Sequence, residues 1–400
     1  MTPWLSIIGV GAEGIASLPA SARVLINNAE IVIGGARHLA MLPHDHPAEK
    51  QGWASPISET VSAMKKLEGR RVVVLATGDP MSYGIGVTLG RAFGPDAMTV
   101  LPAPGAFSLA AARLGWALHE TDCLTLHGRP LAALNLFVRP GARLLILSED
   151  GGTPAKIAET LRDRGYGASV ITALENIGAD TESARSATAD AWDPAPTADL
   201  NTVAVACIAG ETALAYSRVA GLPDDAFTHD GQLTKRVVRA ATLAALAPQP
   251  GEFLWDVGAG CGSIAIEWMR AGGRAVAIER SPERCALIAR NAAMLGTPML
   301  DIVTGAAPDA LKDLSQPDAI FIGGGVSALP LAEACRAALP HRGRLVANAV
   351  TLEGESVLLS LQEKWGGTLT RIAVSEAKPI GGLRGWQPMR PVTQFSAVKP

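Results

Sequence analysis

Short apolar runs alternate with stretches of helical periodicity from residue 230 to the end of the chain. Such runs predict buried strands, and the periodic stretches between them predict helices. Strands are expected at residues 253–257, 275–279, 300–303, 319–322, 345–349, 369–375 and 393–398. Helical stretches separate the first six strands, whereas only a Gly/Pro-rich loop separates the last two. Because helical crossovers join parallel strands, this half predicts a mostly parallel sheet with an antiparallel final strand.

Two further sets of strand-like runs lie in the first half of the chain. They fall at residues 5–10, 31–34, 72–76 and 98–101, and then at 124–127, 144–148, 169–173 and 203–208. They predict two α/β subdomains of about a hundred residues each, a common subdomain size. Residues 217–230 mix Gly, Pro and acidic residues without clear periodicity, which is typical of a linker. We therefore expect an α/β protein with a first domain at 1–216 (subdomains about 1–115 and 116–216), a linker at 217–229 and a second domain at 230–400.

The composition fits this division and narrows the class of protein. The chain has 400 residues, 48% of them hydrophobic, which is enough for at least two cores. A net charge of −3 and a pI near 6.2 argue against a general nucleic-acid-binding protein, which needs a basic excess. Five cysteines at irregular spacing indicate neither a disulfide framework nor a metal site. The first residues lack a basic region, and their apolar run is too short for a bilayer, so we expect a soluble, cytoplasmic protein.

The most informative local pattern is LWDVGAGCGSIAIEW at residues 254–268. An expected strand runs into Asp256, and Gly258, Gly260 and Gly262 then alternate before a helix. This order lets a small ligand lie against bare backbone, while Glu279, at the end of the next strand, is free to bind a ribose diol. S-adenosylmethionine carries an ammonium and a sulfonium but no phosphate, so the acidic residues suit it better than NAD. A plain tight turn is the alternative interpretation.

A second glycine pattern lies close to the amino terminus. Gly9, Gly11 and Gly14 follow an apolar run as G-x-G-x-x-G, which is typical of a dinucleotide site. Two features weaken that interpretation. Glu30 precedes the next strand instead of ending it, and Pro19 stops the long helix that a dinucleotide site needs. A simple glycine turn at a strand end explains this pattern equally well.

Two later segments give the first half a family resemblance. VVVLATGDPMSYGIGVTL at 72–89 ends a buried strand in Gly-Asp-Pro, and LPAPGAFSLAAARLG at 101–115 again places proline and glycine between strand and helix. With the amino-terminal glycine loop, these segments resemble the tetrapyrrole (corrin and porphyrin) methylase family over roughly residues 4–210. In that family the Gly-Asp-Pro loop holds S-adenosylmethionine in the cleft between two α/β subdomains. The resemblance therefore implies the same fold and cofactor here.

The second half resembles a decarboxylating precorrin methylase module, built on the Rossmann-like seven-stranded methyltransferase sheet. The segments that carry this resemblance are HDGQLTKRVVRAATLAAL, LWDVGAGCGSIAIEW, AIERSPERCALIARNAAMLG, VTGAAPDAL, DAIFIGGG and RLVANAVTLE. The fusion of both modules resembles bifunctional methyltransferases of cobalamin biosynthesis. It implies precorrin-6B as substrate, methylation of carbon 5 by the first half, and methylation of carbon 15 with removal of the carbon 12 acetate carboxyl by the second. The product would be precorrin-8.

The resemblance also implies two S-adenosyl-L-methionine sites per chain. In the first half, cofactor contacts are expected from Gly9, Gly11, Gly78, Asp79, Pro80, Ser82 and Ser108. In the second half, they are expected from Gln232 and Thr234 as a lid, and from Asp256, Gly258, Gly260, Gly262, Ser263, Glu279 and Ala306.

Basic residues supply candidate substrate contacts. Because the sixth strand is expected to be parallel, the loop at 376–393 should emerge at the carboxyl edge of the sheet, where ligands bind. A polycarboxylate macrocycle favours guanidinium forks and a flat apolar contact. Substrate contacts are therefore expected from Lys235, Arg384, Trp386 and Arg390. A solvent-exposed basic hairpin would explain the residues of this loop equally well.

Asn348, at the end of the fifth strand, is the candidate catalytic residue, although a cap on the following helix is an equal alternative. His127 in LHGRP is a further candidate substrate contact, and the other histidines lack the spacing of metal ligands, so no metal is expected. Related methylase modules form dimers and tetramers, which implies a homo-oligomer.

Two other functions are weighed against this one. Both folds also host RNA methylation. Against an RNA methyltransferase stand the acidic balance and the absence of an Asn-Pro-Pro-Tyr loop, because the fourth strand ends in Ile322-Gly323-Gly324-Gly325. A cofactor-sensing protein with one decayed site is disfavoured because both glycine loops are intact.

Overall fold

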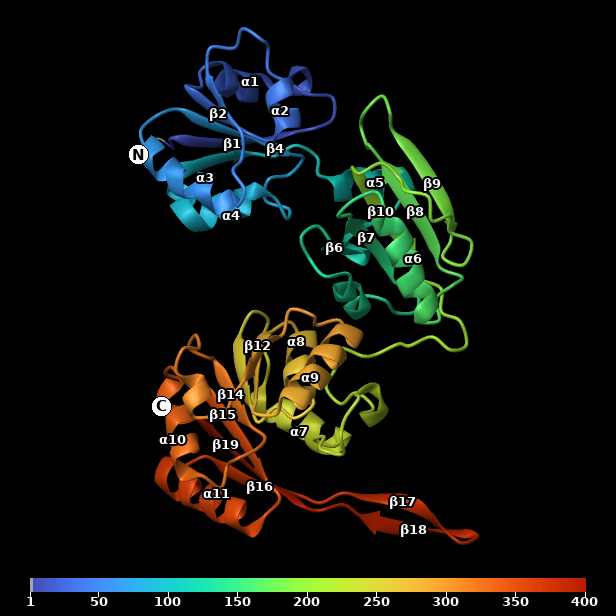
Figure 1. Ribbon diagram of the computed structural model, residues 1–400, viewed down its shortest axis with the longest axis vertical. Helices are drawn as coiled ribbons and strands as arrows, with labels where there is room; N and C mark the ends of the chain where they lie inside the picture. Colours follow the sequence, from blue (N-terminus) through green and yellow to red (C-terminus); the bar gives the residue numbers. More distant parts are fainter. Residues whose placement is uncertain (1–2) are drawn as a thin grey trace. The chain divides into compact units, whose positions relative to one another are not determined.

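The chain folds into two compact units in the computed structural model, which describes residues 3–400 (Figure 1). Unit 1 contains the chain up to Arg129 and the segment Arg139–Leu214, and unit 2 contains Pro130–Val138 and Ala215–Pro400. Each unit has its own sheets and its own hydrophobic core. Within the described part of the chain, no helix is both long and apolar enough to cross a membrane.

The first sheet of unit 1 is parallel throughout, in the order β3-β2-β4-β1-β5. Its strands are β1 (Leu5–Val10), β2 (Ile31–Ile33), β3 (Glu49–Gln51), β4 (Val72–Thr77) and β5 (Met98–Leu101), and its helices are α1 (Ala20–Asn27), α2 (Ala36–Ala40), α3 (Ile57–Met64) and α4 (Ile85–Phe93). β1 and β4 are mostly apolar because both faces of a central parallel strand are buried. The polar edge strand β3 was not predicted, since it carries no apolar run.

The second sheet of unit 1 is mixed, in the order β6-β7-β10-β8-β9. It contains β6 (Asp122–Thr125), β7 (Arg143–Leu147), β8 (Val170–Glu175), β9 (Ser183–Thr188) and β10 (Asn201–Ala206), with α5 (Ala106–Leu114) and α6 (Thr153–Asp163). Only β6 and β7 pair in parallel, and the other pairs are antiparallel. The edge strand β9 has the sequence SARSAT and was also missed by the apolar pattern. The two α/β layers expected for the first half are confirmed.

Unit 2 contains the expected seven-stranded sheet, in the order β13-β12-β11-β14-β15-β19-β16. Its strands are β11 (Phe253–Val257), β12 (Arg274–Glu279), β13 (Asp301–Thr304), β14 (Ala319–Ile322), β15 (Arg344–Ala349), β16 (Thr368–Ile372) and β19 (Val392–Val398). The last strand lies between β15 and β16 and is antiparallel to both. β16 therefore runs in the same direction as β15, so the sixth strand is parallel as predicted.

Helices cover both faces of this sheet (Figure 1). They are α7 (Arg236–Leu246), α8 (Ser263–Arg270), α9 (Pro282–Met294), α10 (Leu329–Ala338) and α11 (Leu352–Trp365). Successive side chains of a strand point to opposite faces, so Leu254 packs in the cluster under α7, α8 and α9, whereas Trp255 packs in the cluster under α10 and α11. Two apolar layers thus hold the carboxyl ends of the parallel strands in a fixed register.

The expected loop at 376–393 is largely a two-stranded hairpin instead. β17 (Ser375–Ile380) pairs with β18 (Leu383–Pro388) in an antiparallel ladder that extends away from the seven-stranded sheet (Figure 1). Gly381 has a φ of 57°, which suits the tight turn of a short hairpin. The side chains of Ile380 and Leu383, next to the turn, and of Trp386, farther along β18, are exposed.

Unit 2 also incorporates chain from outside the predicted second domain. A short 3₁₀ segment, η5 (Leu131–Leu136), packs on α9, where Asn135 Nδ2 donates to Ala293 O at 3.0 Å. A Cβ on Gly296 would lie 2.2 Å from the backbone nitrogen of Leu136, so this contact depends on glycine. The stretch expected to be a linker contributes Leu222 and Phe227 to the core cluster under α7.

Candidate functional site

The glycine loop of unit 2 needs glycine at its alternating positions. Gly258, Gly260 and Gly262 have φ values of 72°, 60° and 80°, a region that side-chain-bearing residues rarely adopt. A Cβ on Gly258 would also lie 2.8 Å from the backbone nitrogen of Gly324. The loop after β11 therefore passes close to the backbone that follows β14 and presents bare backbone to the space beside it.

A cavity of about 670 Å³ opens beside this loop, next to the carboxyl ends of β11, β14 and β15. This volume lies within the range of sites that enclose small ligands. Many of the predicted contacts line it, namely Gln232, Thr234, Lys235, Gly258, Gly260, Ser263, Asn348 and Arg390. Its wall includes apolar residues that the sequence analysis did not single out: Val350, Ile372, Val374, Met389 and Val392.

Two buried carboxylates, Asp256 and Glu279, accept hydrogen bonds from backbone N–H groups in and next to the glycine loop. They do not line the cavity. Asp256 Oδ2 accepts from the backbone N–H of Ala265 at 3.0 Å, which ties β11 to α8. Glu279 accepts from the N–H of Gly260 at 2.9 Å and from that of Ser281 at 3.1 Å. Among the described residues, Asp256 Oδ1 has no hydrogen-bond partner. Burial raises the pKa of Asp256 to about 7, and the neighbouring charge of Glu279 adds to the rise.

Arg239 holds the segment that carries the expected lid. Its guanidinium is fully buried and pairs with Glu267, with Nε donating to Oε1 at 2.5 Å. It also donates to the carbonyl oxygen of Thr234 at 2.5 Å and to that of Leu222. Lys235, which was predicted as a substrate contact, is partly exposed, whereas Arg239 has a structural role.

Asn348 lines the cavity at the end of β15 and is held by two other side chains. Its Nδ2 donates to Thr242 Oγ1 at 2.9 Å, and its Oδ1 accepts from Gln394 Nε2 at 3.0 Å. The helix-cap alternative for Asn348 is wrong, because the cap of α11 is Thr351, whose side chain accepts from Gly354 N. Neither Thr242 nor Gln394 was identified from the sequence, since both lie in amphipathic elements without a recognisable motif.

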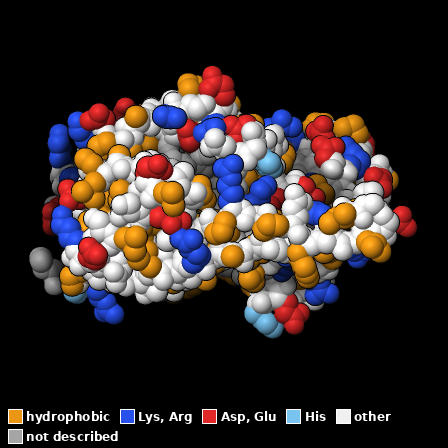
Figure 2. Space-filling model, turned by 90° about the horizontal axis from the view of Figure 1, so that it is seen from below, with side chains coloured by type: hydrophobic (Ala, Val, Ile, Leu, Met, Phe, Trp, Pro, Cys, Tyr) orange, Lys and Arg blue, Asp and Glu red, His pale blue; other side chains and the backbone are white. Residues whose placement is uncertain are grey.

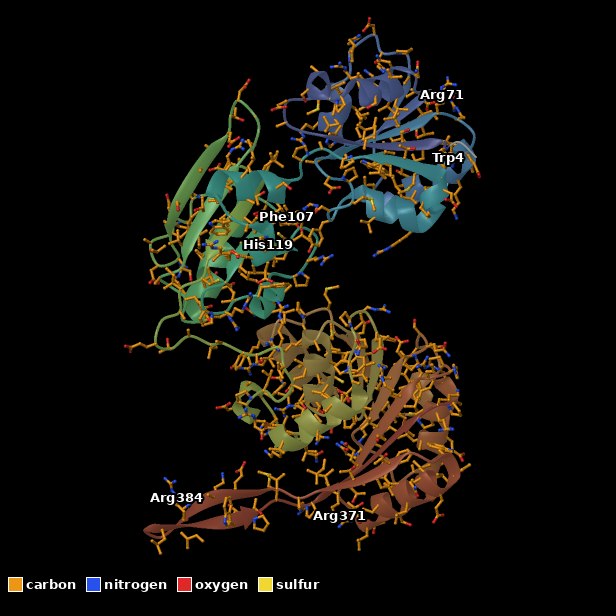
Figure 3. The ribbon with its side chains drawn as sticks, turned by 180° about the vertical axis from the view of Figure 1, so that it is seen from behind. Trp4, Arg71, Phe107, His119, Arg371 and Arg384 are labelled. Carbon is orange, nitrogen blue, oxygen red and sulfur yellow. The ribbon has the colours of Figure 1, made fainter. Side chains whose placement is uncertain are left out.

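The remaining predicted contacts of unit 2 lie outside the cavity lining. Arg384 and Trp386 are on β18, and Figure 3 shows Arg384 out on the hairpin. Trp386 is 77% exposed. Ala306 is exposed in the loop after β13, at the carboxyl edge of the sheet. Arg390, by contrast, follows the hairpin and lines the cavity.

In unit 1, the first glycine loop and the Gly-Asp-Pro loop pack directly on each other. A Cβ on Gly9 would lie 1.9 Å from the carbonyl oxygen of Gly78, so only glycine allows this approach. The same oxygen accepts from Ala103 N at 3.1 Å, which joins the third predicted segment to the pair. Asp79 Oδ1 accepts from Met81 N at 2.8 Å and shapes the turn. The three motifs that carried the family resemblance thus meet at one sheet edge.

A smaller cavity of about 60 Å³ lies at this edge, and Gly11 and Gly78 line it. The other predicted residues do not line it: Gly9 lies in β1, Asp79, Pro80 and Ser82 lie in the loop after β4, and Ser108 lies in the first turn of α5. His127 is also outside the lining; it is exposed, with Nδ1 3.5 Å from Glu149.

Arg37 is a cavity residue of unit 1 that the sequence analysis missed. It lines the small cavity, and its Nη2 donates to Thr77 Oγ1 at 3.1 Å. The same hydroxyl lies 3.2 Å from Nε2 of His38. Burial lowers the pKa of His38, and the positive charge of Arg37 lowers it further. Arg37 could have been identified from the sequence, because it lies directly after the strand predicted at residues 31–34.

Each half of the chain matches a protein family. Residues 5–192 match the model for tetrapyrrole (corrin/porphyrin) methylases, and residues 225–399 match the model for the precorrin methyltransferase domain. These ranges contain the two sets of glycine loops described above, one in each unit.

Relatives match the whole chain or about half of it. A precorrin-6Y C(5,15)-methyltransferase (decarboxylating) from Sinorhizobium sp is 47% identical over 401 residues, 100% of this chain and 97% of the relative. A cobalt-precorrin-7 C(5)-methyltransferase from Salmonella typhimurium is 28% identical and covers 44% of this chain and 87% of its own length. A probable cobalt-precorrin-6B C(15)-methyltransferase (decarboxylating) from Saccharolobus solfataricus is 32% identical, over 46% of this chain and 97% of the relative. With its two modules and its full-length match, the chain belongs to the family of decarboxylating precorrin-6Y C(5,15)-methyltransferases.

Proposed function

We propose that this protein methylates precorrin-6B, also called precorrin-6Y, at carbons 5 and 15 and removes the acetate carboxyl at carbon 12, giving precorrin-8. The observation that carries this proposal is the match to a relative of that name over 100% of this chain. The cavity beside the glycine loop of unit 2 supports this proposal, because its volume of about 670 Å³ is large enough to enclose a small ligand. S-adenosyl-L-methionine is the methyl donor of this family.

The two reactions are assigned to different units. Relatives named for the carbon 5 reaction alone and for the carbon 15 reaction with decarboxylation alone each cover less than half of this chain. The precorrin methyltransferase domain matches residues 225–399, which lie in unit 2. We assign carbon 15 and the decarboxylation to unit 2, carbon 5 to unit 1, and one S-adenosyl-L-methionine site to each.

In unit 2, the glycine loop supplies the cofactor site. The bare backbone at Gly258 and Gly260 allows close approach of a ligand, and Gln232 and Thr234 line the same cavity. Gln232 lies next to the loop, because a Cβ on Gly260 would be 3.6 Å from its carbonyl oxygen. Glu279 keeps the loop in shape through the N–H of Gly260. Methyl transfer is an in-line displacement, so holding donor and acceptor carbon in contact and in line lowers the barrier by up to about 7–11 kcal/mol.

The substrate is assigned to the part of the cavity between the lid and the hairpin base. Lys235 and Arg390 line that part, and their positive charges suit a macrocycle that carries several carboxylates. The apolar wall formed by Ile372, Val374 and Val392 removes water from the ring. Loss of carbon dioxide leaves an electron pair that the conjugated ring can accept, so the protein needs only to orient and desolvate the carboxylate.

An RNA substrate finds no support. The relatives described above act on precorrins by name, and none of those names refers to RNA. On the face shown in Figure 2, basic and acidic side chains are interspersed, without the continuous basic surface that a phosphate backbone requires.

Two further features belong to this proposal, the oligomeric state and the location of the protein. The exposed apolar side chains of Ile380, Leu383 and Trp386 favour self-association, so we propose a homo-oligomer, which light scattering would test.

All five cysteines are free, which fits a cytoplasmic location.

The direct test is anaerobic incubation of the full chain with precorrin-6B and isotopically labelled S-adenosyl-L-methionine, followed by mass spectrometry. Gain of two labelled methyl groups and loss of one carbon dioxide are expected. An unchanged tetrapyrrole mass, with the protein folded and the cofactor bound, would refute the proposal.

A further inference from the structure

Three uncharged side chains from different elements meet at the wall of the unit 2 cavity. Asn348 lies on β15, Thr242 on α7 and Gln394 on β19. Thr242 Oγ1 accepts from Asn348 Nδ2 at 2.9 Å and from Gln394 Nε2 at 3.0 Å. Gln394 Nε2 also donates to Asn348 Oδ1 at 3.0 Å. The three side chains therefore form a closed ring of hydrogen bonds.

The threonine hydroxyl decides the direction of every bond in this ring. Thr242 Oγ1 donates its single proton to the carbonyl oxygen of Val238 at 2.8 Å. Its two lone pairs are then the groups that face the two amides, so each amide must present nitrogen, not oxygen, to the hydroxyl. Both protons of Gln394 Nε2 are used, one on Thr242 and one on Asn348. Neither amide can rotate by 180° without placing two acceptors against each other.

This arrangement leaves Asn348 with a defined remaining capacity. One of its two N–H protons and one lone pair of Oδ1 are not used within the ring. Thr242 and Gln394 are buried, with 0% and 6% exposure, whereas Asn348 is half-buried and lines the cavity. The ring thus has one member that can reach a ligand and two members that cannot.

Stability alone does not call for such a ring. A buried polar cluster contributes little more than well-packed apolar side chains of the same shape, and it costs free energy whenever one member is unsatisfied. Its distinct effect is to hold one amide in one orientation. A reduced tetrapyrrole offers partners for both free groups of that amide, since carboxylates at its rim accept hydrogen bonds and pyrrolic N–H groups donate them.

We propose that Thr242 and Gln394 are positioning residues, which fix the amide of Asn348 so that its free N–H meets a carboxylate oxygen of the tetrapyrrole and its free lone pair meets a pyrrolic N–H. This inference rests on the proposed function of unit 2. It assigns the ring to the carbon 15 reaction and leaves the carbon 5 reaction of unit 1 independent of it.

Thr242→Val tests the proposal in the full chain, because valine keeps the shape of threonine but cannot accept from either amide. We expect kcat for carbon 15 methylation to fall about tenfold or more, the value of one lost hydrogen bond in the transition state. The KM for S-adenosyl-L-methionine and the rate of carbon 5 methylation should stay unchanged. Thr242→Ser keeps the hydroxyl and should restore most of the rate.

Gln394→Glu gives a readout that a purely structural role would not produce. A carboxylate cannot donate to Thr242 or to Asn348, so carbon 15 methylation should be slow at neutral pH. Protonation of the new side chain restores one donor, so the deficit against the native chain should shrink as the pH falls. Gln316→Glu adds the same charge at an exposed glutamine whose Nε2 donates to Ala338 O, away from the cavity lining, and should follow the native pH profile.

The outcomes separate this inference from the proposed function. If the native chain does not methylate carbon 15, the proposed function itself fails. If the native chain is active and Thr242→Val matches it, or if valine and serine variants are equally slow, the positioning role is refuted. Should Thr242→Val fail to fold, as judged by binding of S-adenosylhomocysteine, the pH profile of Gln394→Glu decides: a profile parallel to the native one overturns the proposal.

Discussion

Arg239 and Glu267 form a buried ion pair in unit 2, with Nε and Oε1 2.5 Å apart. The same carboxylate accepts from the backbone N–H of Leu222, and the same guanidinium donates to the carbonyl oxygen of Thr234. The pair therefore connects α7 and α8 with the segment that forms one wall of the cavity. Neither charge lines the cavity, so the pair has a structural role.

Loss of one partner from this pair should be costly. Glu267→Gln leaves the buried guanidinium of Arg239 with Asp224 as its remaining countercharge, at 3.2 Å and with the Asp224 side chain 30% exposed. We expect the free energy of unfolding to fall by about 1.5–3 kcal/mol, the contribution of a hydrogen bond to a charged group. Urea denaturation measures the loss, and hydrogen exchange should show earlier opening at residues 221–234. Glu355→Gln is the matched control, because its partner Arg371 is 58% exposed (Figure 3), and such pairs contribute at most about 1 kcal/mol. Equal losses in both variants would contradict the structural role of Arg239.

Stability should depend on pH through Asp256. Its pKa is raised from 3.8 to about 7 in the folded chain, so folding takes up a proton between these values, and the free energy of unfolding falls as the pH rises. Between about pH 5 and pH 8 the expected decrease from this group is about 2–3 kcal/mol. Asp256→Asn should remove this part of the slope. Thermal or urea unfolding at several pH values measures it, and an unchanged slope in the variant would show that Asp256 is not the group responsible.

The number of cofactor sites, proposed to be two per chain, can be tested with glycine variants. Gly258→Ala places a Cβ 2.8 Å from Gly324 N in a backbone conformation that alanine disfavours by about 1–2 kcal/mol, so the glycine loop of unit 2 should be distorted. Calorimetric titration with S-adenosylhomocysteine should then give one site per chain in place of two. Gly251→Ala is the control, since Gly251 also has a positive φ, of 86°, but its Cβ would meet open space. Two sites in Gly258→Ala would place cofactor binding elsewhere.

Arg390 and Arg384 differ in their relation to the cavity, although the sequence places them in the same basic segment. Arg390 lines the cavity, whereas Arg384 is exposed on β18. Arg390→Ala should raise the KM for the tetrapyrrole about tenfold or more, the effect of about 1.4 kcal/mol of lost binding. Arg384→Ala should change it much less. A larger rise in KM for Arg384→Ala than for Arg390→Ala would indicate that the substrate lies along the hairpin, as the sequence pattern also allowed.

Much of the fold was predictable because its signals are local. The central strands β1, β4, β11 and β14 are mostly apolar, since parallel strands are buried on both faces. Edge strands need not be apolar on both faces, and the polar edge strands β3 and β9 were therefore missed. The position of β19 between β15 and β16 also escaped the sequence, because sheet order depends on which apolar faces meet, and no local pattern records that choice.

The residues of the candidate sites were also predictable only in part. The sequence by itself determined the glycine loops, because a turn with positive φ or a backbone contact tolerates few other residues, and this restriction is visible at single positions such as Gly258 and Gly9. Only the tertiary structure decided which side chains complete the cavity. Thr242, Asn348 and Gln394 lie 106 and 46 residues apart along the chain, and they meet because β19 returns beside β15 while α7 packs across both. Hydrogen bonds between such distant residues depend on the packing of whole elements, so no spacing in the sequence encodes them.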